Sequence, residues 1–329
     1  MAALMIYGCT SYTARLALED AASLDLSIIL GGRSENKIKT LASGLNLPYR
    51  IFELDDAGLV DASLKDVKVL LNCSGPCKHT AQPLMTACIR TGTHYIDIAA
   101  ELDSYERALQ LDREARDARV LLMPGCGGSV AMLGCLANYA LERVENPKSI
   151  DIALHVAGSI SRGSAVSASE GISNHYLKRA EGVLVEEGQG ATLDFELPRR
   201  QRSCGVFPMT LPDLITIWKS TSVPNIQTFV HVSAEEHTFP TGSSQHMPVG
   251  PTERQRKASP YHAAVVVAGE DGSVREAVLH TANGYTFTAK ASLEAARRIL
   301  QGVKRTGFQT PADVFGMRFV GCVAGSVTR

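Results

Sequence analysis

Within the first 127 residues, short apolar runs alternate with helix-forming segments, and this alternation limits the possible folds more than any other feature of the sequence. Each run has the length of a buried strand, and the six runs span residues 4–7, 27–30, 49–54, 67–73, 95–98 and 120–123. The run VKVLLNC at 67–73 is almost continuously apolar, as expected for a strand covered on both faces. Six such strands separated by helices predict an α/β fold with a Rossmann-type, doubly wound parallel sheet.

The pattern changes after Gly128. An apolar helix is predicted over 130–142, and polar and apolar residues then alternate over 149–157, 192–197, 227–232, 262–268 and 273–279. Such alternation is typical of strands with one solvated face. We therefore predict a first domain over residues 1–127 and a second, α+β domain over 128–329, built on a mostly antiparallel sheet. The open face of that sheet is the expected substrate platform, and its exposed strands make a homodimer the candidate assembly.

The composition argues against several classes of partner and site. Of 329 residues, 45% are hydrophobic and 20% are charged, and the formal net charge is −1. This balance gives no electrostatic reason to expect nucleic acid or a membrane as a partner. The eight cysteines show neither a C-x-x-C pair nor a zinc spacing, so we expect buried free thiols and no metal site. Because the N-terminus runs directly into a strand, without an export or spanning segment, a cytoplasmic location is expected.

The first strand ends in a tight turn, and a helix follows at once. In LMIYGCTSYTAR, residues 4–15, small residues stand at Gly8, Ser11 and Ala14, the three positions of a dinucleotide-binding glycine fingerprint. Backbone N–H groups and the helix dipole at such a turn hold a pyrophosphate. The candidate contacts are Gly8, Thr10, Ser11, Tyr12 and Thr13. A βα turn without any ligand is the alternative that these residues leave open.

The end of the second strand bears on the choice of cofactor. An acidic residue at this position binds the ribose 2′-hydroxyl of NAD, whereas an arginine accommodates the 2′-phosphate of NADP. This chain has Arg33 followed by Ser34, and Lys37 stands one helical turn further on. The pattern predicts NADP as the cofactor, unless Arg33 is a surface residue without a ligand.

A polar loop follows the apolar run at 67–73. Ligands of parallel sheets lie beyond the carboxyl ends of the strands. We therefore expect this loop to lie along the cofactor, with contacts from Asn72, Ser74, Gly75 and Pro76.

Two motifs follow one another between residues 72 and 101. They are the loop N-C-x-G-P and the segment A-C-x-x-x-G-T-H-Y-x-D-x-x-x-E. In this order they resemble the saccharopine dehydrogenase-like oxidoreductases, whose first turn usually has glycines where this chain has Ser11 and Ala14. The matching residues are Asn72, Gly75, Pro76, Gly92, Thr93, Tyr95, Asp97 and Glu101. Similarity at 213–225 and 284–311 extends the resemblance to the second domain, and it implies that the tail, about 284–329, packs back on the first domain.

Hydride transfer often needs a group that protonates the atom beside the acceptor carbon. His175 and Tyr176 are candidates, because they lie together on a predicted helix after a glycine-rich loop, and Tyr285 in the tail segment is another. Tyr261 and its neighbour His262 are further possibilities. For Asp97 we expect a structural role, in which its carboxylate accepts backbone N–H groups in the turn after its strand. Residues 241–260 are expected to form a mobile surface loop or lid.

The residues and the resemblance together predict an NADP-dependent oxidoreductase. More narrowly, they favour an NADPH-dependent reductase of a C=C, C=N or C=O bond in a small, rather apolar metabolite. The arginines of the second domain are scattered rather than placed for a charged amino-acid conjugate, so we expect specialised metabolism rather than lysine biosynthesis. Two alternatives stay open. One is a redox-neutral isomerase or cyclase on the same fold, which Ser11 favours, and the other is a non-catalytic binding protein.

Overall fold

The structure is a computed structural model that describes residues 3–21, 24–171, 176–188, 193–197, 201–233 and 248–329. The chain forms two compact units. Unit 1 consists of Met1–Gly127 and Thr288–Gln309, and unit 2 consists of Gly128–Phe287 and Thr310–Arg329.

Unit 1 is built on a seven-stranded parallel sheet, which confirms the predicted Rossmann-type fold. The strands lie in the spatial order β15, β6, β5, β4, β1, β2, β3. Their bounds are β1 (Ala3–Tyr7), β2 (Ser27–Gly32), β3 (Tyr49–Ile51), β4 (Val67–Asn72), β5 (His94–Asp97), β6 (Leu121–Met123) and β15 (Gly307–Phe308). Six of them correspond to the predicted apolar runs, whereas β15 comes from the tail and pairs with β6.

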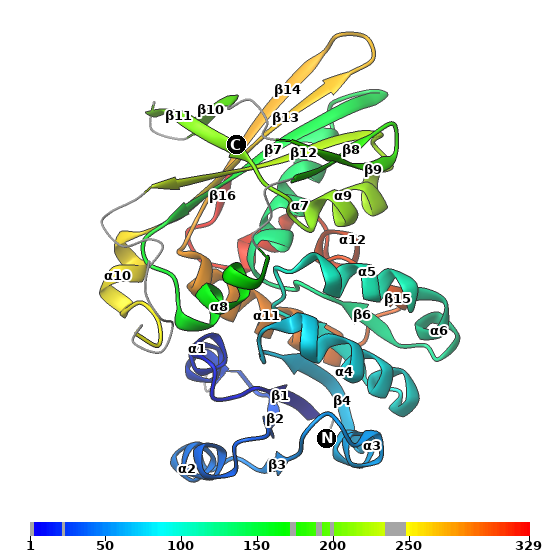
Figure 1. Cartoon of the computed structure of the whole chain (residues 1–329), viewed down its shortest axis with the longest axis vertical. Coiled ribbons are helices and arrows are strands. Elements are labelled where there is room, and N and C mark those ends of the chain that lie inside the picture. Colours follow the sequence, from blue (N-terminus) through cyan, green and yellow to red (C-terminus); the bar gives the residue numbers. More distant parts are fainter. Residues whose placement is uncertain (1–2, 22–23, 172–175, 189–192, 198–200, 234–247) are drawn as a thin grey trace. The chain divides into compact units, whose positions relative to one another are not determined.

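Helices cover both faces of this sheet (Figure 1). They are α1 (Tyr12–Ala21), α2 (Glu35–Leu45), α3 (Ala57–Leu64), α4 (Cys77–Thr91), α5 (Leu102–Gln110), α6 (Asp112–Asp117) and α11 (Gly284–Leu300), which enters unit 1 at Thr288. All five residues of β1 are buried, as required of a central strand with helices on both sides. The strand order reverses between β1 and β4, and open α/β sheets bind ligands beside such a switch point.

Unit 2 contains a second sheet, in the order β10, β11, β12, β7, β13, β14, β16, with the hairpin β8–β9 attached to β12. Among the described ladders, β7 and β12 pair in parallel and the others are antiparallel. The predicted mostly antiparallel sheet is therefore confirmed. The bounds are β7 (Pro147–Ala157), β8 (Tyr176–Ala180), β9 (Val183–Glu187), β10 (Leu193–Leu197), β11 (Gln201–Pro208), β12 (Asn225–Ser233), β13 (Tyr261–Gly269), β14 (Val274–Thr281) and β16 (Val327–Thr328).

Unit 2 also contains several helical segments, and some of them pack against α7. The segments are α7 (Gly128–Leu141), α8 (Arg162–Gly171), α9 (Asp213–Thr221), α10 (Glu253–Ala258), α12 (Pro311–Phe315) and the 3₁₀ helix η2 (Met317–Cys322). Helix α7 contacts the sheet through β7, β13 and β14 and also packs against α9, α12 and η2. Its sequence is apolar nearly all round because it is enclosed in this way.

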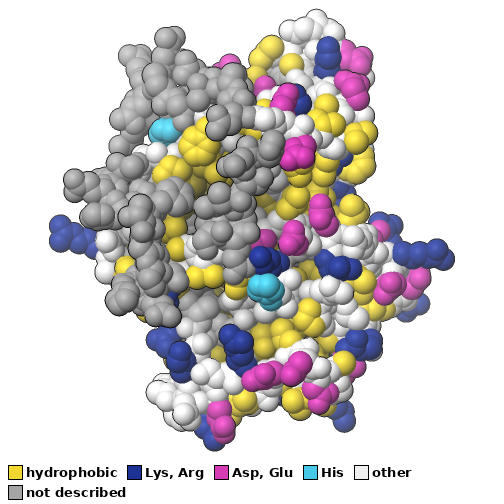
Figure 2. Space-filling model, in the orientation of Figure 1, with side chains coloured by type: hydrophobic (Ala, Val, Ile, Leu, Met, Phe, Trp, Pro, Cys, Tyr) yellow, Lys and Arg dark blue, Asp and Glu magenta, His cyan; other side chains and the backbone are white. Residues whose placement is uncertain are grey.

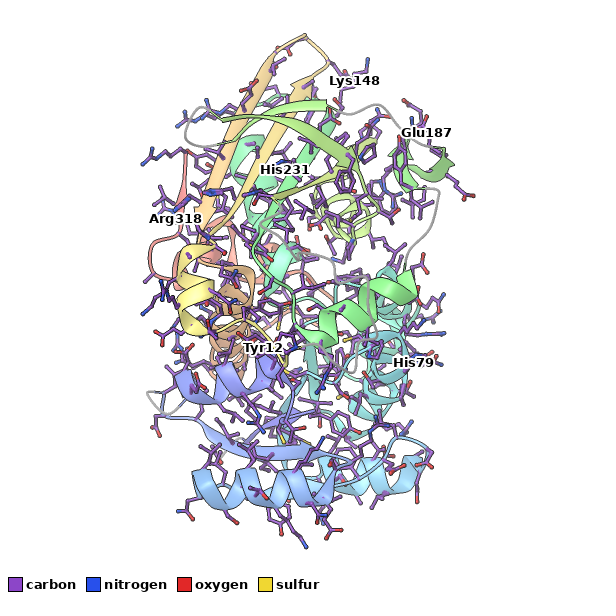
Figure 3. The ribbon with its side chains drawn as sticks, turned by 60° about the vertical axis from the view of Figure 1, so that its left-hand side comes forward. Tyr12, His79, Lys148, Glu187, His231 and Arg318 are labelled. Atoms are coloured by element: carbon purple, nitrogen blue, oxygen red, sulfur yellow. The ribbon has the colours of Figure 1, made fainter. Side chains whose placement is uncertain are left out.

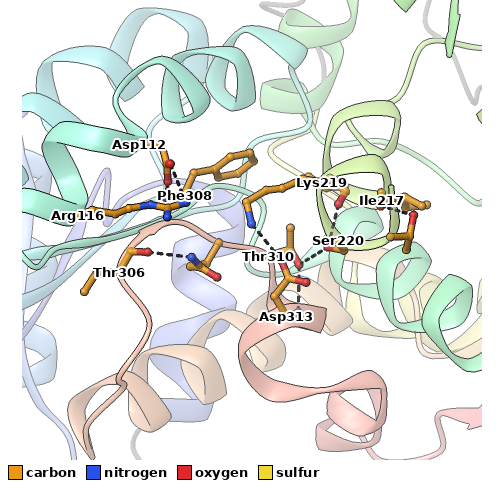
Figure 4. A network of polar contacts seen from close by, with 12 residues as sticks. Asp112, Arg116, Ile217, Lys219, Ser220, Thr306, Phe308, Thr310 and Asp313 are labelled. Atoms are coloured by element: carbon orange, nitrogen blue, oxygen red, sulfur yellow. Dashed lines mark hydrogen bonds and ion pairs between the residues drawn. The ribbon is translucent and has the colours of Figure 1, made fainter. Parts of the chain in front are cut away.

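The tail is divided between the two units, which corrects the expectation that all of 284–329 packs on the first domain. In unit 1, the Phe308 amide donates a hydrogen bond to Asp112 Oδ1 at 2.7 Å (Figure 4). In unit 2, Lys219 Nζ pairs with Asp313 Oδ2 at 3.3 Å, and β16 pairs with β14. Residues 310–329 belong to unit 2 because both their helix and their strand find partners there.

Two local predictions differ from the structure. Residues 176–180, expected on a helix, form strand β8, because pairing with β9 overrides the helix-forming residues in YLKRA. Within the expected loop at 241–260, residues 253–258 form helix α10, which begins at a capping box between Thr252 and Gln255. The earlier part of that loop, up to residue 247, lies outside the described residues.

The described cysteines agree with the expectation of free thiols. Six of them are buried and Cys322 is partly exposed, while the Cys204 side chain lies outside the described residues. None of the described helices has the length and apolar character needed to cross a membrane. On the face shown in Figure 2, positive side chains are interspersed with negative ones.

Candidate active site

The turn after β1 meets the loop after β4 at the switch point of the sheet. Gly8 has φ +74°, and a Cβ added to it would lie 2.7 Å from the backbone nitrogen of Ser74. The Gly8 N–H donates a hydrogen bond to Gly31 O at 2.9 Å, which ties the turn to the end of β2. Only glycine therefore fits here, for reasons of backbone angle and of space. The two loops predicted to hold the cofactor are brought together.

Ser11 caps the first helix. Its Oγ accepts a hydrogen bond from the Ala14 N–H at 3.3 Å, and its own N–H donates to Gly8 O at 2.9 Å. The hydroxyl thus takes up one N–H group at the start of α1 that a glycine would leave for a ligand. Thr10, Ser11 and Tyr12 are half-buried, and Thr13 is buried. Figure 3 shows Tyr12 where α1 begins, at the positive end of the helix dipole.

The cations expected to bind a 2′-phosphate lie at the end of β2 and in the first turn of α2. The side chains of Arg33 and Lys37 are exposed, and Ser34 is the N-cap residue of α2. The Ser34 hydroxyl makes no capping hydrogen bond within the described structure, so it can donate to a ligand. Burial raises the pKa of Tyr7 to about 12, an effect that the positive charge of Arg33 nearby partly offsets.

A network of side-chain hydrogen bonds shapes the loop at 72–76. Asn72 is fully buried, and its Oδ1 accepts the Ser74 N–H at 3.0 Å. Asn72 Nδ2 donates to Tyr95 Oη at 3.2 Å and to Thr80 Oγ1 at 3.0 Å. Thr80 Oγ1 in turn donates to Ser74 O at 2.8 Å. The loop backbone is therefore held from two sides before any ligand binds.

Asp97 extends this network to the loop after β6. Tyr95 Oη donates to Asp97 Oδ2 at 2.8 Å, and Asp97 Oδ1 accepts the N–H groups of Ala99 at 2.9 Å and Gly125 at 2.7 Å. The predicted structural role of Asp97 is thus confirmed. Burial raises the pKa of Asp97 to about 6, although its backbone hydrogen bonds act in the opposite direction.

Glu101 also has a structural position. Its Oε1 accepts the Cys77 N–H at 3.0 Å, at the start of α4, and its Oε2 accepts the Ala100 N–H at 2.9 Å. The sequence did not identify Thr80 and Tyr95 as residues that shape the loop. For Tyr95 a signal was present, since it belongs to the motif G-T-H-Y-x-D, whereas nothing marked Thr80 among the residues of its helix.

In unit 2, Tyr285 lies in a cluster of hydroxyl groups at the start of α8. The Ser161 N–H donates to Tyr285 Oη at 2.6 Å, and Tyr285 Oη donates to Ser164 Oγ at 2.8 Å. Ser161 Oγ lies 3.1 Å from Ser164 Oγ and also accepts the Ser164 N–H at 3.2 Å. The phenol proton is therefore directed along a chain of hydroxyls. The two serines come from the glycine- and serine-rich loop, but the sequence did not single them out.

The other proton-donor candidates lie elsewhere. Tyr176 is on β8, where its Oη donates to Glu187 Oε2 at 3.0 Å, and Lys178 forms an ion pair with the same carboxylate. His175 lies outside the described residues. The ring of Tyr261 packs against Gly284, where an added Cβ would lie 2.5 Å from its Cε2, and burial raises the pKa of Tyr261. None of these contacts joins Tyr176 to Tyr285.

Comparisons with known proteins concern mainly unit 1. Residues 4–123 match the family model of the saccharopine dehydrogenase NADP binding domain. A "trans-acting enoyl reductase" of Mycobacterium leprae is 28% identical over 134 residues, which is 38% of this chain and 32% of that protein. A mouse "saccharopine dehydrogenase-like oxidoreductase" is 28% identical over 117 residues, 30% of this chain and 27% of that protein. The matched part thus spans about a third of the length of these relatives.

Among solved structures, apo saccharopine dehydrogenase (L-Glu forming) of Saccharomyces cerevisiae has the same fold. The two chains align over 100% of both lengths with a TM-score of 0.67 and 11% sequence identity. The cofactor named by the family model is NADP, in agreement with the prediction from the end of β2. Residues 4–123 therefore form a saccharopine dehydrogenase NADP-binding domain, and the family resemblance read from the motifs at 72–101 is confirmed for this part of the chain.

Proposed function

We propose that this chain is an NADPH-dependent reductase of a small, rather apolar metabolite. The observation that carries the proposal is the meeting of the Gly8 turn with the Ser74 loop at the switch point, together with Arg33 at the end of β2. The Gly8 turn places the N–H groups at the start of α1 beside the Ser74 loop, and this arrangement suits a pyrophosphate. NADPH, when bound, supplies the hydride.

Residues of unit 1 would hold each part of the cofactor. The turn at Gly8–Thr13 would bind the pyrophosphate through backbone N–H groups, and Arg33, Ser34 and Lys37 would bind the 2′-phosphate. The loop at 72–76 would lie along the cofactor toward its reactive end. Because Asn72 and Asp97 fix this loop through buried hydrogen bonds, it needs little reorganisation on binding.

Among the acceptor bonds, a C=C bond conjugated to a carbonyl is the favoured substrate group. The support comes from the mycobacterial relatives, which are named trans-acting enoyl reductases and match this chain over about 130 residues. Reduction of such a bond adds a hydride to one carbon and a proton to its neighbour. The C=N and C=O bonds remain in the proposal as further acceptors, and the pathway we propose is one of specialised metabolism. A cytoplasmic homodimer is part of the same proposal.

Tyr285 is the proton donor that we propose. Its phenol proton lies on a hydrogen bond to Ser164, so a proton given to the substrate can be replaced through the hydroxyl chain. Tyr285→Phe should lower kcat by about 100-fold or more and leave the Kd for NADPH unchanged. Tyr176→Phe is the matched comparison, because this phenol is bonded to Glu187 on a surface hairpin. A large loss of kcat in Tyr176→Phe with none in Tyr285→Phe would reverse the assignment and restore the His175–Tyr176 pair as the candidate.

The proposed function is tested by binding and then by turnover. The purified chain is titrated with NADPH and NADH, with the fluorescence of the bound nicotinamide as the signal. It is then mixed with NADPH and one enoyl, one imine or one carbonyl compound, and the absorbance at 340 nm is followed. Selective NADPH binding with oxidation by the enoyl compound supports the proposal in full. Failure to bind either cofactor would leave the non-catalytic binding protein as the better description.

A redox-neutral enzyme on the same fold is the second candidate, and Ser11 favours it. The Ser11 hydroxyl occupies the turn and takes the Ala14 N–H for itself, where the family usually has glycine. NADPH binding without oxidation by any of the three acceptor classes would support this candidate. Ser11→Gly would then be expected to tighten NADPH binding, since it frees that N–H group and weakens the helix cap by only a few tenths of a kcal/mol.

A further inference from the structure

Four histidines form a row across the second sheet, and neither the fold nor the proposed reduction requires them. The strand register places His231 of β12 opposite His155 of β7, His155 opposite His262 of β13, and His262 opposite His280 of β14. Because side chains at opposed positions point to the same face, the four imidazoles lie side by side on one face of the sheet. Figure 3 labels one of them, His231. We call these four residues the histidine row.

The imidazole rings of the row touch one another. The ring centroids are 5.1 Å apart for His231 and His155, 5.5 Å for His155 and His262, and 4.5 Å for His262 and His280. The first two pairs are stacked, with interplanar angles of 27° and 18°. A proton on any of these rings therefore places a positive charge against the ring beside it.

Hydrogen bonds determine how many protons the row can hold without loss of contacts. The Nδ1 atoms of His262 and His280 are 2.8 Å apart, so one of them must accept and be unprotonated. One added proton turns this pair into an imidazolium–imidazole hydrogen bond, but a second proton breaks the bond. Within the described structure, Nδ1 of His155 and of His231 is buried and has no hydrogen-bond partner, while His155 Nε2 lies 2.9 Å from Ser233 Oγ.

Among the described side chains of these four strands, the carboxylates on this face lie several positions away from the row. On these four strands the charged residues of this face are Asp151 of β7 and Glu276 of β14, and the described parts of β12 and β13 contribute none. Each carboxylate is four positions from the histidine on its own strand, about 13 Å at the usual rise per residue. The neighbouring strand β16 presents Val327 opposite His280, and Val206 of β11 packs on the apolar part of the face. Among the described side chains of these strands, the nearest titratable group to each imidazole of the row is therefore another imidazole.

We propose that the histidine row is a proton-responsive element, which destabilises unit 2 as the pH falls below neutral. His155 stacks against two other rings of the row, and its position opposes protonation. Burial and the neighbouring His231 lower the pKa of His155 to about 4, from about 6.5 in an unfolded chain. A group with a lowered native pKa contributes stability above its unfolded pKa, and that contribution is lost as the pH falls from about 6.5 to 4.

Two buried carboxyl groups of the same unit respond in the opposite direction. Burial raises the pKa of Asp213 to about 7 and also raises that of Asp151, so acid stabilises unit 2 through these groups. Net acid sensitivity of the wild type is therefore not the right measure. The proposal is instead tested by comparing the wild type with His155→Gln, because both proteins contain the two carboxyl groups.

The test is urea unfolding of the full chain, followed by fluorescence of Trp218. This single tryptophan lies on α9 in unit 2, with the Arg179 guanidinium 4.1 Å from its ring centre. For the wild type and for His155→Gln, the equilibrium constant of unfolding at pH 5 is divided by the equilibrium constant at pH 6. We expect this ratio to be about sevenfold larger in the wild type, as the two pKa values of His155 require. His79→Gln, an exposed histidine of α4 in unit 1, should give the wild-type ratio.

Equal ratios in the wild type and His155→Gln would overturn the proposal. If His155→Gln does not fold, the proposal is tested on the wild type by an NMR titration of the histidine ring signals. The His155 ring signal is assigned by through-bond correlation to the backbone of that residue. We expect the His155 ring to stay neutral at pH 5. A titration midpoint between 6 and 7 for that ring would overturn the proposal equally.

Discussion

Replacing Arg33 by aspartate tests the interpretation of the β2 end most directly. Arg33 is exposed, and no carboxylate stands beside it in the sequence GGRSENK before Glu35. A 2′-phosphate carries about 1.5 to 2 negative charges at neutral pH, and each pair of unit charges 4 Å apart in water interacts by about 1 kcal/mol. Reversing the sign of the side chain therefore changes the interaction with the phosphate by about 3 to 4 kcal/mol before screening. Physiological salt, with a Debye length of about 8 Å, reduces this to about 2 kcal/mol, or roughly 30-fold in Kd.

The assay compares the Kd values of NADPH and NADH by nicotinamide fluorescence at two ionic strengths. In Arg33→Asp, NADPH should bind about 30-fold more weakly, while NADH changes little because its 2′-hydroxyl is neutral. The difference should narrow at high salt. Arg113→Asp is the matched control, since it makes the same change in charge on α6, where the side chain is 95% exposed. Strand β6, which follows α6 in the chain, lies four strand positions from β2 in the sheet, about 19 Å away. Equal losses for both cofactors in Arg33→Asp would refute the reasoning.

Two further predictions concern the stability of unit 1. Gly8→Ala should lower the free energy of unfolding by at least about 2 kcal/mol and abolish NADPH binding, because its Cβ would collide with the backbone of Ser74 at positive φ. By contrast, Gly44→Ala on α2 meets no atom within 4 Å and should stabilise by about 0.5 to 1 kcal/mol; urea unfolding followed by circular dichroism measures both. Because the pKa of Asp97 is raised, this group stabilises the native state in acid and loses that contribution as the pH rises through about 6. The free energy of unfolding of the wild type, relative to that of Asp97→Asn, should therefore fall by roughly 1 kcal/mol between pH 5 and 7. If the difference between the two proteins does not change with pH, the raised pKa of Asp97 is contradicted.

Much of unit 1 could be predicted because its signals are local. A continuous apolar run indicates a buried parallel strand. A glycine at position 8 indicates the turn, because its positive φ is an angle that glycine tolerates and other residues rarely adopt. The role of Asp97 followed similarly from its place after a strand. The candidate cofactor residues were predicted by the same logic, and they remain predictions about a ligand even though the structure brings the two loops together at Gly8 and Ser74.

The sequence by itself determined the strands of the first sheet, the turn with which the chain begins its first helix, and the change to alternating strands after Gly128. Each of these depends on residues within a few positions of one another. Only the tertiary structure decided that YLKRA is a strand, that β15 joins the first sheet while β16 joins the second, and that four histidines from distant segments lie in one row. These features depend on pairing between strands that are far apart in the sequence. Such pairing is determined by register and burial, and local propensity carries no information about either.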